Sequence, residues 1–219
     1  MVDDTKQRLL AAAGQIFADK GFEAASIREI CHQAEANLAA VHYHFGDKRQ
    51  LYVAAVRVAQ CAQVDAIPFP EWPSDMPAQA RLRAFIGTMF ERMLDQQRPP
   101  WHLQLMLREL AHPTEACEAI VEDYIRPMAS TLRSILRDLL PEDLDEQSRW
   151  RMGFSVVGQI LFYYVHRPIV RLLLGVDADE QLTVDALADH VTRFSLAAMS
   201  AHALAPTQLV RALAPEVQP

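Results

Sequence analysis

The stretch SIREICHQAEANLAAVHYHFGDKRQL, residues 26–51, decides the fold, because two short helical segments are joined there by a turn too short for anything but a compact corner. Ser26 can cap the first helix while Glu29 reaches back to the amide of Ser26, which is the reciprocal arrangement of a capping box. Asn37 can cap a second helix, in which Val41 points inward. The pattern predicts a helix-turn-helix.

The second helix of this stretch leaves several side chains facing outward or at its rim. Its two alanines are small enough to let the helix backbone approach the floor of a DNA major groove, and the imidazoles and phenol that follow can reach phosphates and base edges. The outward set comprises Leu38, Ala39, Ala40, His42, Tyr43 and His44. This composition favours docking on DNA over catalysis.

Residues 5–60 resemble the DNA-binding domain of TetR/AcrR-type bacterial transcriptional regulators. The resemblance rests on an opening amphipathic helix that ends in FADKGF, a Ser-x-x-Glu-Ile helix start, the run AVHYHF, and Gly-Asp-Lys at the start of a fourth helix. It implies that Lys48 contacts a DNA phosphate, and that Arg28, His42, Tyr43 and His44 touch backbone or bases. The expected DNA-binding residues are Ser26, Arg28, Asn37, Leu38, Ala39, Ala40, His42, Tyr43, His44 and Lys48.

Two positions depart from the family pattern. Glu35 stands where the turn usually carries Gly, and Ala39 stands where the recognition helix often carries Gly. The segment AAVHYHFGDK, residues 39–48, resembles one subgroup of these regulators, and SVVGQILFYYVHRPIVRLL, residues 155–173, resembles the C-terminal domain of the same subgroup.

The composition predicts an all-α protein, because strand patterns are absent and Ala, Leu, Arg and Glu fill the periodic stretches. About nine helices are expected. A proline-rich break at residues 67–77 separates a three-helix helix-turn-helix domain, residues 1–62, from a larger ligand-binding and dimerisation domain, residues 63–219. Further helices are expected at 48–64, 78–95, 101–110, 114–140 with a break or kink at Pro127, 148–166 and 184–203.

The net charge of −7 comes from the second of these domains. Residues 1–60 hold equal numbers of basic and acidic side chains, so affinity for DNA should depend on a specific dimeric fit more than on general attraction. Three cysteines without CxxC spacing are typical of a reducing cytoplasm. With neither a signal peptide nor an apolar run long enough to span a bilayer, we expect a cytoplasmic protein without membrane contact.

The sequence shows no pattern for catalysis, a metal or a cofactor. It contains no Gly-rich phosphate loop, GxSxG or paired-carboxylate motif, and the pair His42-x-His44 has no third ligand nearby. The protein is therefore not expected to be an enzyme.

The expected helix at 148–166 is apolar on two sides, so it needs covering on both. A second apolar stripe on the last helix has the matching spacing, and two such helices from each of two chains would form a four-helix dimer interface. The family resemblance implies the same homodimer. The alternative is that both helices form the core of a monomer. The expected interface residues are Val156, Ile160, Tyr163, Leu187, Val191, Phe194 and Ala198.

Methionine and aromatic side chains recur on several of the expected helices and suit an adaptable apolar cavity, although each could equally be an ordinary core residue. The resemblance favours a small-molecule effector, of unspecified identity, bound among them. The expected pocket residues are Phe85, Met89, Met93, Trp101, Leu105, Tyr124, Met128, Trp150, Phe154 and Gln159.

Two functions remain open from the sequence. The favoured one is a ligand-responsive homodimeric repressor that binds palindromic operator DNA. The other is a helical ligand-binding or enzymatic protein in which the N-terminal motif is only a packing corner. Binding to the DNA upstream of the protein's own gene separates them.

Overall fold

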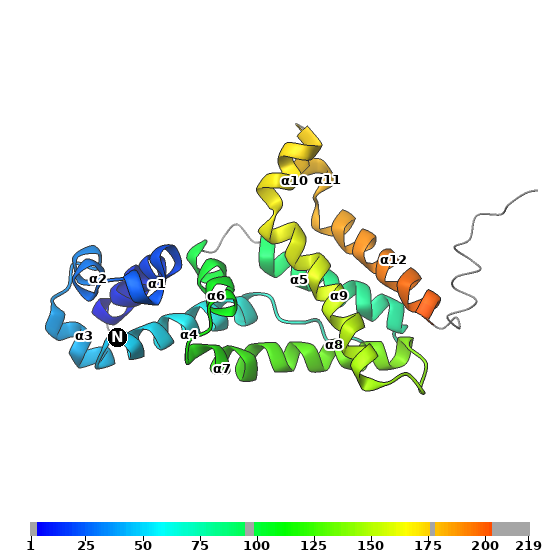
Figure 1. Ribbon diagram of the computed structural model, residues 1–219, viewed down its shortest axis with the longest axis horizontal. Coiled ribbons are helices and arrows are strands. Elements are labelled where there is room, and N and C mark those ends of the chain that lie inside the picture. The colour runs from blue at the N-terminus through cyan, green and yellow to red at the C-terminus, as the bar shows by residue number, and fades with distance from the viewer. Residues whose placement is uncertain (1–3, 95–98, 176–177, 203–219) are drawn as a thin grey trace, which may run out of the picture. The chain divides into compact units, whose positions relative to one another are not determined.

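The computed structural model describes residues 4–94, 99–175 and 178–202, and every regular element in these ranges is a helix (Figure 1). The predicted all-α fold is therefore confirmed. Packing divides the chain into two units: Met1–Pro68 with Asp95–Met128, and Phe69–Leu94 with Ala129–Pro219. No helix in the described ranges is long and apolar enough to cross a membrane.

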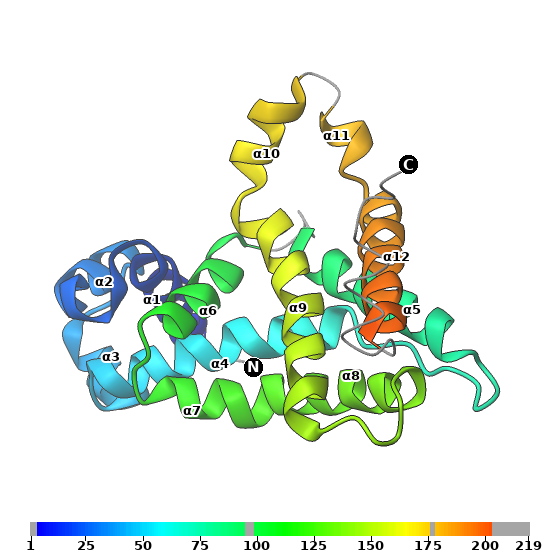
Figure 2. The same cartoon turned by 45° about the vertical axis from the view of Figure 1, so that its right-hand side comes forward.

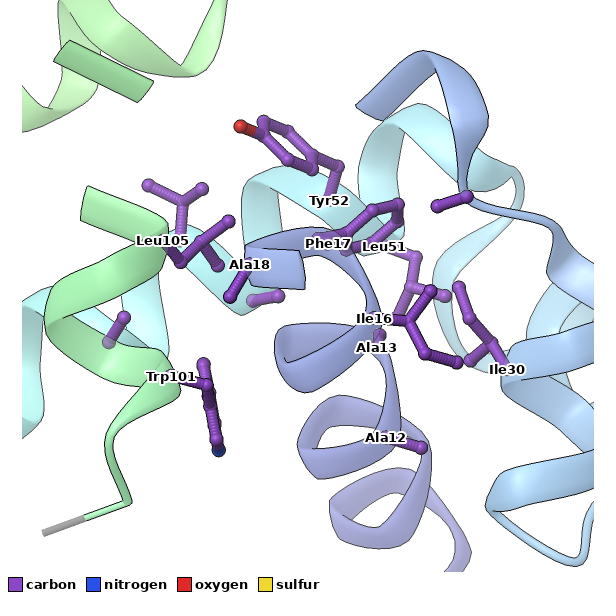
Figure 3. Close-up of a cluster of buried hydrophobic side chains, with 14 of the residues drawn as sticks. Ala12, Ala13, Ile16, Phe17, Ala18, Ile30, Leu51, Tyr52, Trp101 and Leu105 are labelled. Carbon is purple, nitrogen blue, oxygen red and sulfur yellow. The ribbon is translucent and has the colours of Figure 1, made fainter. Parts of the chain in front are cut away.

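The first unit is built on a long connecting helix, α4 (Lys48–Ala66), against which the N-terminal helices and the short helix α6 pack. Its other helices are α1 (Asp4–Ala24), α2 (Ile27–Gln33), α3 (Leu38–Phe45), α6 (Trp101–Ala111), α7 (Ala116–Ile120) and the π-helical turn η1 (Val121–Ile125). Figure 3 shows side chains of α1, α2, α4 and α6 meeting in one apolar cluster. The helix-turn-helix thus shares its core with α6.

Helix α1 and helix α6 approach closely at Gly14. A Cβ atom at this position would lie only 2.2 Å from the Trp101 ring, so the indole occupies the space that any other residue would need. Arg108 on α6 adds a polar link, because its guanidinium donates to the carbonyl oxygens of Ala18 and Asp19 near the C-terminal end of α1, each at 3.3 Å. These contacts hold α6 against the N-terminal helices.

The fully buried carboxylate of Glu109 ties α6 to α4. Its Oε2 accepts a hydrogen bond from the Tyr52 hydroxyl at 2.5 Å, and its Oε1 accepts from the Thr114 backbone amide at 2.6 Å and from the Thr114 hydroxyl at 2.8 Å. A buried charge is tolerated only when it is hydrogen-bonded in this way. Burial first, and then the hydrogen bond to Glu109, raise the pKa of the Tyr52 phenol above its ordinary value.

The helical run after Thr114 is irregular before Pro127, not at it. The turn η1 ends at Ile125, and α8 (Arg126–Leu139) then starts with Pro127 in its first turn. Proline lacks an amide hydrogen and its ring crowds the carbonyl four residues earlier, that of Asp123, which lies inside the π-helical turn. The predicted irregularity is present, and a widened turn accommodates it.

In the second unit, α12 (Val184–His202) packs against α5 (Ala78–Leu94) and α9 (Glu146–Val165). Asp145 caps α9 by accepting a hydrogen bond from the Ser148 amide at 2.9 Å, and the hydrogen bond from the Ser148 side chain is the main cause that lowers the Asp145 pKa. The core of this unit includes Leu82, Phe85, Ile86, Met89, Phe90, Ile135, Val156, Ile160 and Val191.

Three short helices in the described ranges were not separated by the sequence analysis: α7, α10 (Arg167–Leu174) and α11 (Ala178–Gln181). The division into units also differs from the expected functional division at residues 1–62 and 63–219, because α6 and α7 pack on the N-terminal helices. The functional division stays a prediction.

Replacing Tyr52 by Phe removes a hydrogen bond to a buried carboxylate, so the free energy of unfolding at neutral pH should fall by about 1.5–3 kcal/mol in urea denaturation. The folded-state pKa of Tyr52 is raised, so its stabilising effect is complete below the unfolded value, about 10, and is lost as the pH rises through the folded value. The variant should therefore lose less stability than the wild type above about pH 10.

The matched control is Tyr43→Phe, since the Tyr43 side chain is 84% exposed and its hydroxyl faces solvent. Equal stability of the Tyr52→Phe variant and the wild type would show that the buried hydrogen bond contributes nothing.

Candidate DNA-binding site

Helix α2 begins after Ser26, as predicted, but the predicted capping box is wrong. Ser26 has the extended backbone of a cap residue (φ −109°, ψ 132°), yet its side chain makes no capping hydrogen bond. Glu29 does not reach back to the start of its own helix, because its Oε1 accepts from Lys20 Nζ at 2.5 Å. A competing ion pair with α1 has replaced the local cap.

The turn between α2 and α3 places Glu35 in the left-handed region, with φ 48°. This is the position at which the sequence departs from the glycine of the family pattern. A non-glycine residue pays roughly 1–2 kcal/mol for this conformation. The backbone around it is held by two hydrogen bonds, from the Glu35 amide to the His32 carbonyl at 3.2 Å and from the Ala36 amide to the Cys31 carbonyl at 2.9 Å.

Both ends of α3 are closed by specific contacts. Asn37 Oδ1 accepts a hydrogen bond from the Ala40 amide at 2.8 Å, which confirms the predicted cap. Val41 is 1% exposed and anchors the inner side of the helix, while Phe45 packs against the same core. Gly46 ends the helix with φ 84°, a left-handed conformation that suits glycine.

The outer side of α3 is open to solvent in the first unit. Leu38 is 48% and Tyr43 84% exposed, and Ala39 and His42 are exposed as well. The Tyr43 ring meets the half-buried His44 ring edge-on, with centroids 4.8 Å apart. A small-residue patch beside an aromatic hydroxyl is suited to a groove in which the backbone must come close and a side chain must reach further.

The His42 ring is held in one orientation by a contact between Nδ1 and the carbonyl oxygen of Gly46, 2.6 Å apart. A carbonyl oxygen only accepts, so Nδ1 is assigned the hydrogen and the neutral ring presents Nε2 as an acceptor. An acceptor in the major groove suits the amino groups of adenine or cytosine.

Lys48 lies at the start of α4, which Asp47 caps by accepting a hydrogen bond from the Gln50 amide at 2.8 Å. The Lys48 ammonium donates to the Glu23 carbonyl at 3.1 Å and lies 4.7 Å from the centre of the Phe22 ring. The sequence analysis missed both partners, because a backbone carbonyl carries no signature in the sequence.

The expected DNA-binding set therefore falls into three groups in the first unit. Ser26, Arg28, Leu38, Ala39, His42 and Tyr43 are exposed; Ala40, His44 and Lys48 are half-buried; and Asn37 is exposed but uses its side-chain oxygen for the cap. Their contact with DNA stays a prediction.

The expected pocket residues do not gather in one described place. Trp101, Leu105 and Tyr124 belong to the core of the first unit, to which the half-buried Met128 is also assigned. Phe85 and Met89 lie in the core of the second unit and Met93 and Gln159 are half-buried there, whereas Trp150 and Phe154 are exposed and stack on each other with centroids 5.6 Å apart.

The expected dimer stripe is shifted around its helices. Val156, Ile160, Leu187 and Val191 are buried within the second unit, so these four side chains are not available to a partner. Tyr163 and Ala198 are half-buried, and Phe194 remains 58% exposed. Helical periodicity defined the stripes but not which of them the chain would cover itself.

Among the described residues, no group of three or more His, Cys, Asp or Glu side chains is placed to hold a metal ion.

Replacing Asn37 by Ala removes the cap of α3 and should lower the free energy of unfolding by about 0.5–2 kcal/mol in urea denaturation. Ser26→Ala is the matched control, because Ser26 occupies a cap position without a side-chain hydrogen bond and should change stability by less than about 0.5 kcal/mol. A larger loss from Ser26→Ala than from Asn37→Ala would contradict this assignment of the caps.

The chain is similar to two described families of sequence. Residues 9–55 match "Bacterial regulatory proteins, tetR family", and residues 78–199 match "HTH-type transcriptional dual regulator CecR, C-terminal domain". The first match contains α2, α3 and their capping residues, and the second runs from α5 into α12.

Curated relatives span most of the chain. The HTH-type transcriptional dual regulator CecR of Shigella flexneri is 28% identical over 191 residues, covering 83% of this chain and 85% of CecR. The HTH-type transcriptional regulator BetI of Rhizobium meliloti is 26% identical over 190 residues, covering 85% of this chain and 89% of BetI.

Among solved structures, SCO3833 of Streptomyces coelicolor, a member of the TetR transcriptional regulator family, has the same fold, with a TM-score of 0.60 and 22% identity over 84% of this chain and 89% of that one. The fatty acid degradation regulator FadR of Bacillus halodurans has a TM-score of 0.59 and 15% identity over 90% of this chain and 96% of that one. With its capped recognition helix and its CecR-type C-terminal domain, the chain belongs to the TetR family of bacterial transcriptional regulators.

Proposed function

We propose that the protein is a cytoplasmic homodimeric repressor that binds a palindromic operator and is released from it by a small-molecule effector. The observation that carries the proposal is the outer side of α3, which is fixed at both ends and open to solvent. Repression is supported by the HTH-type transcriptional repressor NicS of Pseudomonas putida, which is 24% identical over 84% of this chain and 88% of NicS.

The charge of the N-terminal region argues for a dimer. Residues 1–60 carry no net charge, so a single head has little general attraction to DNA. Two heads related by a two-fold axis double the number of base contacts and require half-sites spaced by about one helical turn of DNA. Specificity then depends on the fit of two recognition helices.

The test of DNA binding is a gel-shift and footprint with the full chain and the DNA upstream of its own gene. We expect a protected, roughly palindromic site and a complex of two chains per site. Failure to bind this DNA, and also a pool of random duplexes, more tightly than unrelated DNA would leave the helix-turn-helix as a packing corner.

Replacing Tyr43 by Ala should weaken operator binding by about 1–3 kcal/mol per half-site if the exposed phenol contacts a base, and should relax the preference at that base pair. Replacing Lys48 by Ala serves as the contrasting variant, because loss of a phosphate contact weakens all sequences alike and flattens the salt dependence. Binding curves with operator and random DNA at several salt concentrations measure both effects. Unchanged affinity and preference in Tyr43→Ala would exclude that base contact.

The proposed effector site is the aromatic and thioether side of α5 in the second unit. Phe85 stacks on Phe69 with centroids 5.0 Å apart and the two rings 5° from parallel, and Met89 is buried one turn further along the helix. Such a surface suits a largely apolar molecule. An effector of repression is also supported by the nicotine-responsive repressor HdnoR of Paenarthrobacter nicotinovorans, 40% identical over 30% of this chain and 34% of HdnoR.

An effector can weaken DNA binding only through its different affinities for the free and DNA-bound forms, with typical couplings of about 1–3 kcal/mol. Any compound that raises the melting temperature should therefore weaken operator binding, and operator DNA should weaken binding of the compound by the same factor. Two calorimetric titrations measure the pair of factors. A compound that binds the wild type but not a Met89→Asp variant, and yet leaves operator affinity unchanged, would remove the regulatory role from this site.

A further inference from the structure

The second unit carries an exposed apolar face that runs along α9 and continues onto α10. On α9, Phe154 is 65% exposed, and Phe162 and Val165 are each 51% exposed. These positions, together with the exposed Gly158, are spaced by three or four residues and so lie on one side of the helix. Large exposed apolar patches on soluble proteins mark interaction surfaces.

Helix α10 presents its apolar side outward. Leu172 is 84% and Leu173 80% exposed, and Ile169, one turn earlier, is 55% exposed, whereas Val170 is buried and anchors the helix to its unit. Figures 1 and 2 both show α10 and α11 projecting beyond α9 and α12. A surface helix of a monomer normally turns its apolar stripe toward the core, so the outer stripe of α10 is left for a partner.

Gly158 supplies an independent observation on the same face. It lies in the interior of α9, where glycine is less favourable than alanine, and a Cβ atom there would meet nothing within 4 Å. Nothing described in the unit therefore requires a missing side chain. The contrast is Gly14, where the Trp101 ring fills that space. A glycine without a reason inside its own unit is explained by the close approach of a backbone from outside.

We infer that a second copy of this chain covers this face, that the two α9 helices cross at Gly158, and that α10 is an arm which reaches over the partner. The inference rests on the proposed dimeric function and specifies its interface. It departs from the stripe expected from the sequence, because Val156 and Ile160 are buried within the unit.

The symmetry of α9 favours a second copy over any other occupant. Phe154 and Phe162 lie four residues on either side of Gly158. A two-fold axis at an antiparallel crossing there sets Phe154 of one protomer against the partner's Phe162, and the same contact occurs twice. The face also continues beside α12, which packs on α9 and exposes Phe194, so one surface holds all the uncovered rings named here.

The test is sedimentation of the full chain over a range of concentrations, with the variants Gly158→Leu and Leu172→Glu/Leu173→Glu. Neither change meets a neighbour in the described unit, and leucine favours a helix more than glycine does, so both variants should stay folded. We expect each to raise the dimer dissociation constant by at least about tenfold. Gly158→Ala should also weaken the dimer, whereas its matched control Gly87→Ala, which gains only an ordinary contact with Ala188, should not.

The outcomes separate this inference from the proposed function. A wild-type chain that is monomeric at micromolar concentration overturns both. A wild-type dimer that all the variants leave unchanged overturns the interface assigned to α9 and α10, while a dimeric regulator stands. An unchanged dimer with wild-type binding to anionic phospholipid vesicles, lost in Leu172→Glu/Leu173→Glu, assigns the face to a lipid surface and likewise overturns the inference.

Discussion

Helix α3 is too short to exist on its own, and the proposed DNA-reading surface depends on this constraint. It has eight residues, well below the length at which an isolated helix is stable in water. Its stability comes from the Asn37 cap at one end, the left-handed Gly46 at the other and the burial of Val41 between them. Because the anchoring groups all lie on the inner side or at the ends, the outer side is free to vary in sequence.

The same constraint reaches further into the first unit. Val41 packs on a core that also contains Phe17 and Tyr52, and the Phe17 and Tyr52 rings meet edge-on with centroids 4.9 Å apart. Tyr52 is in turn fixed by Glu109 of α6. A displacement of α6 would therefore disturb a hydrogen-bonded buried charge as well as apolar contacts, and buried polar networks resist partial disruption. The head and α6 should respond to perturbation together.

The sequence was sufficient for the features that depend on neighbouring residues. The all-α fold, the cap by Asn37 and the inward Val41 follow from local spacing, and the structure confirms them. Features set by residues distant in the chain were not predictable in this way. Glu29 is taken from its predicted role by Lys20, nine residues earlier, and the apolar stripes of α9 did not reveal which one faces α5 and α12. Periodicity gives the faces of a helix, but tertiary packing chooses among them.

The positions that break local rules point most directly to function. A glutamate in a left-handed turn, a glycine in the interior of a helix and leucines exposed on an amphipathic one are each unfavourable for the isolated unit. Glu35 fixes the corner between α2 and α3, while Gly158 and Leu172 become favourable only when another surface covers them. A monomer optimised for stability alone would carry Gly, Ala and a polar residue at these three sites. The cost retained at each is consistent with a chain whose final stable form is an assembly on DNA rather than the single protomer.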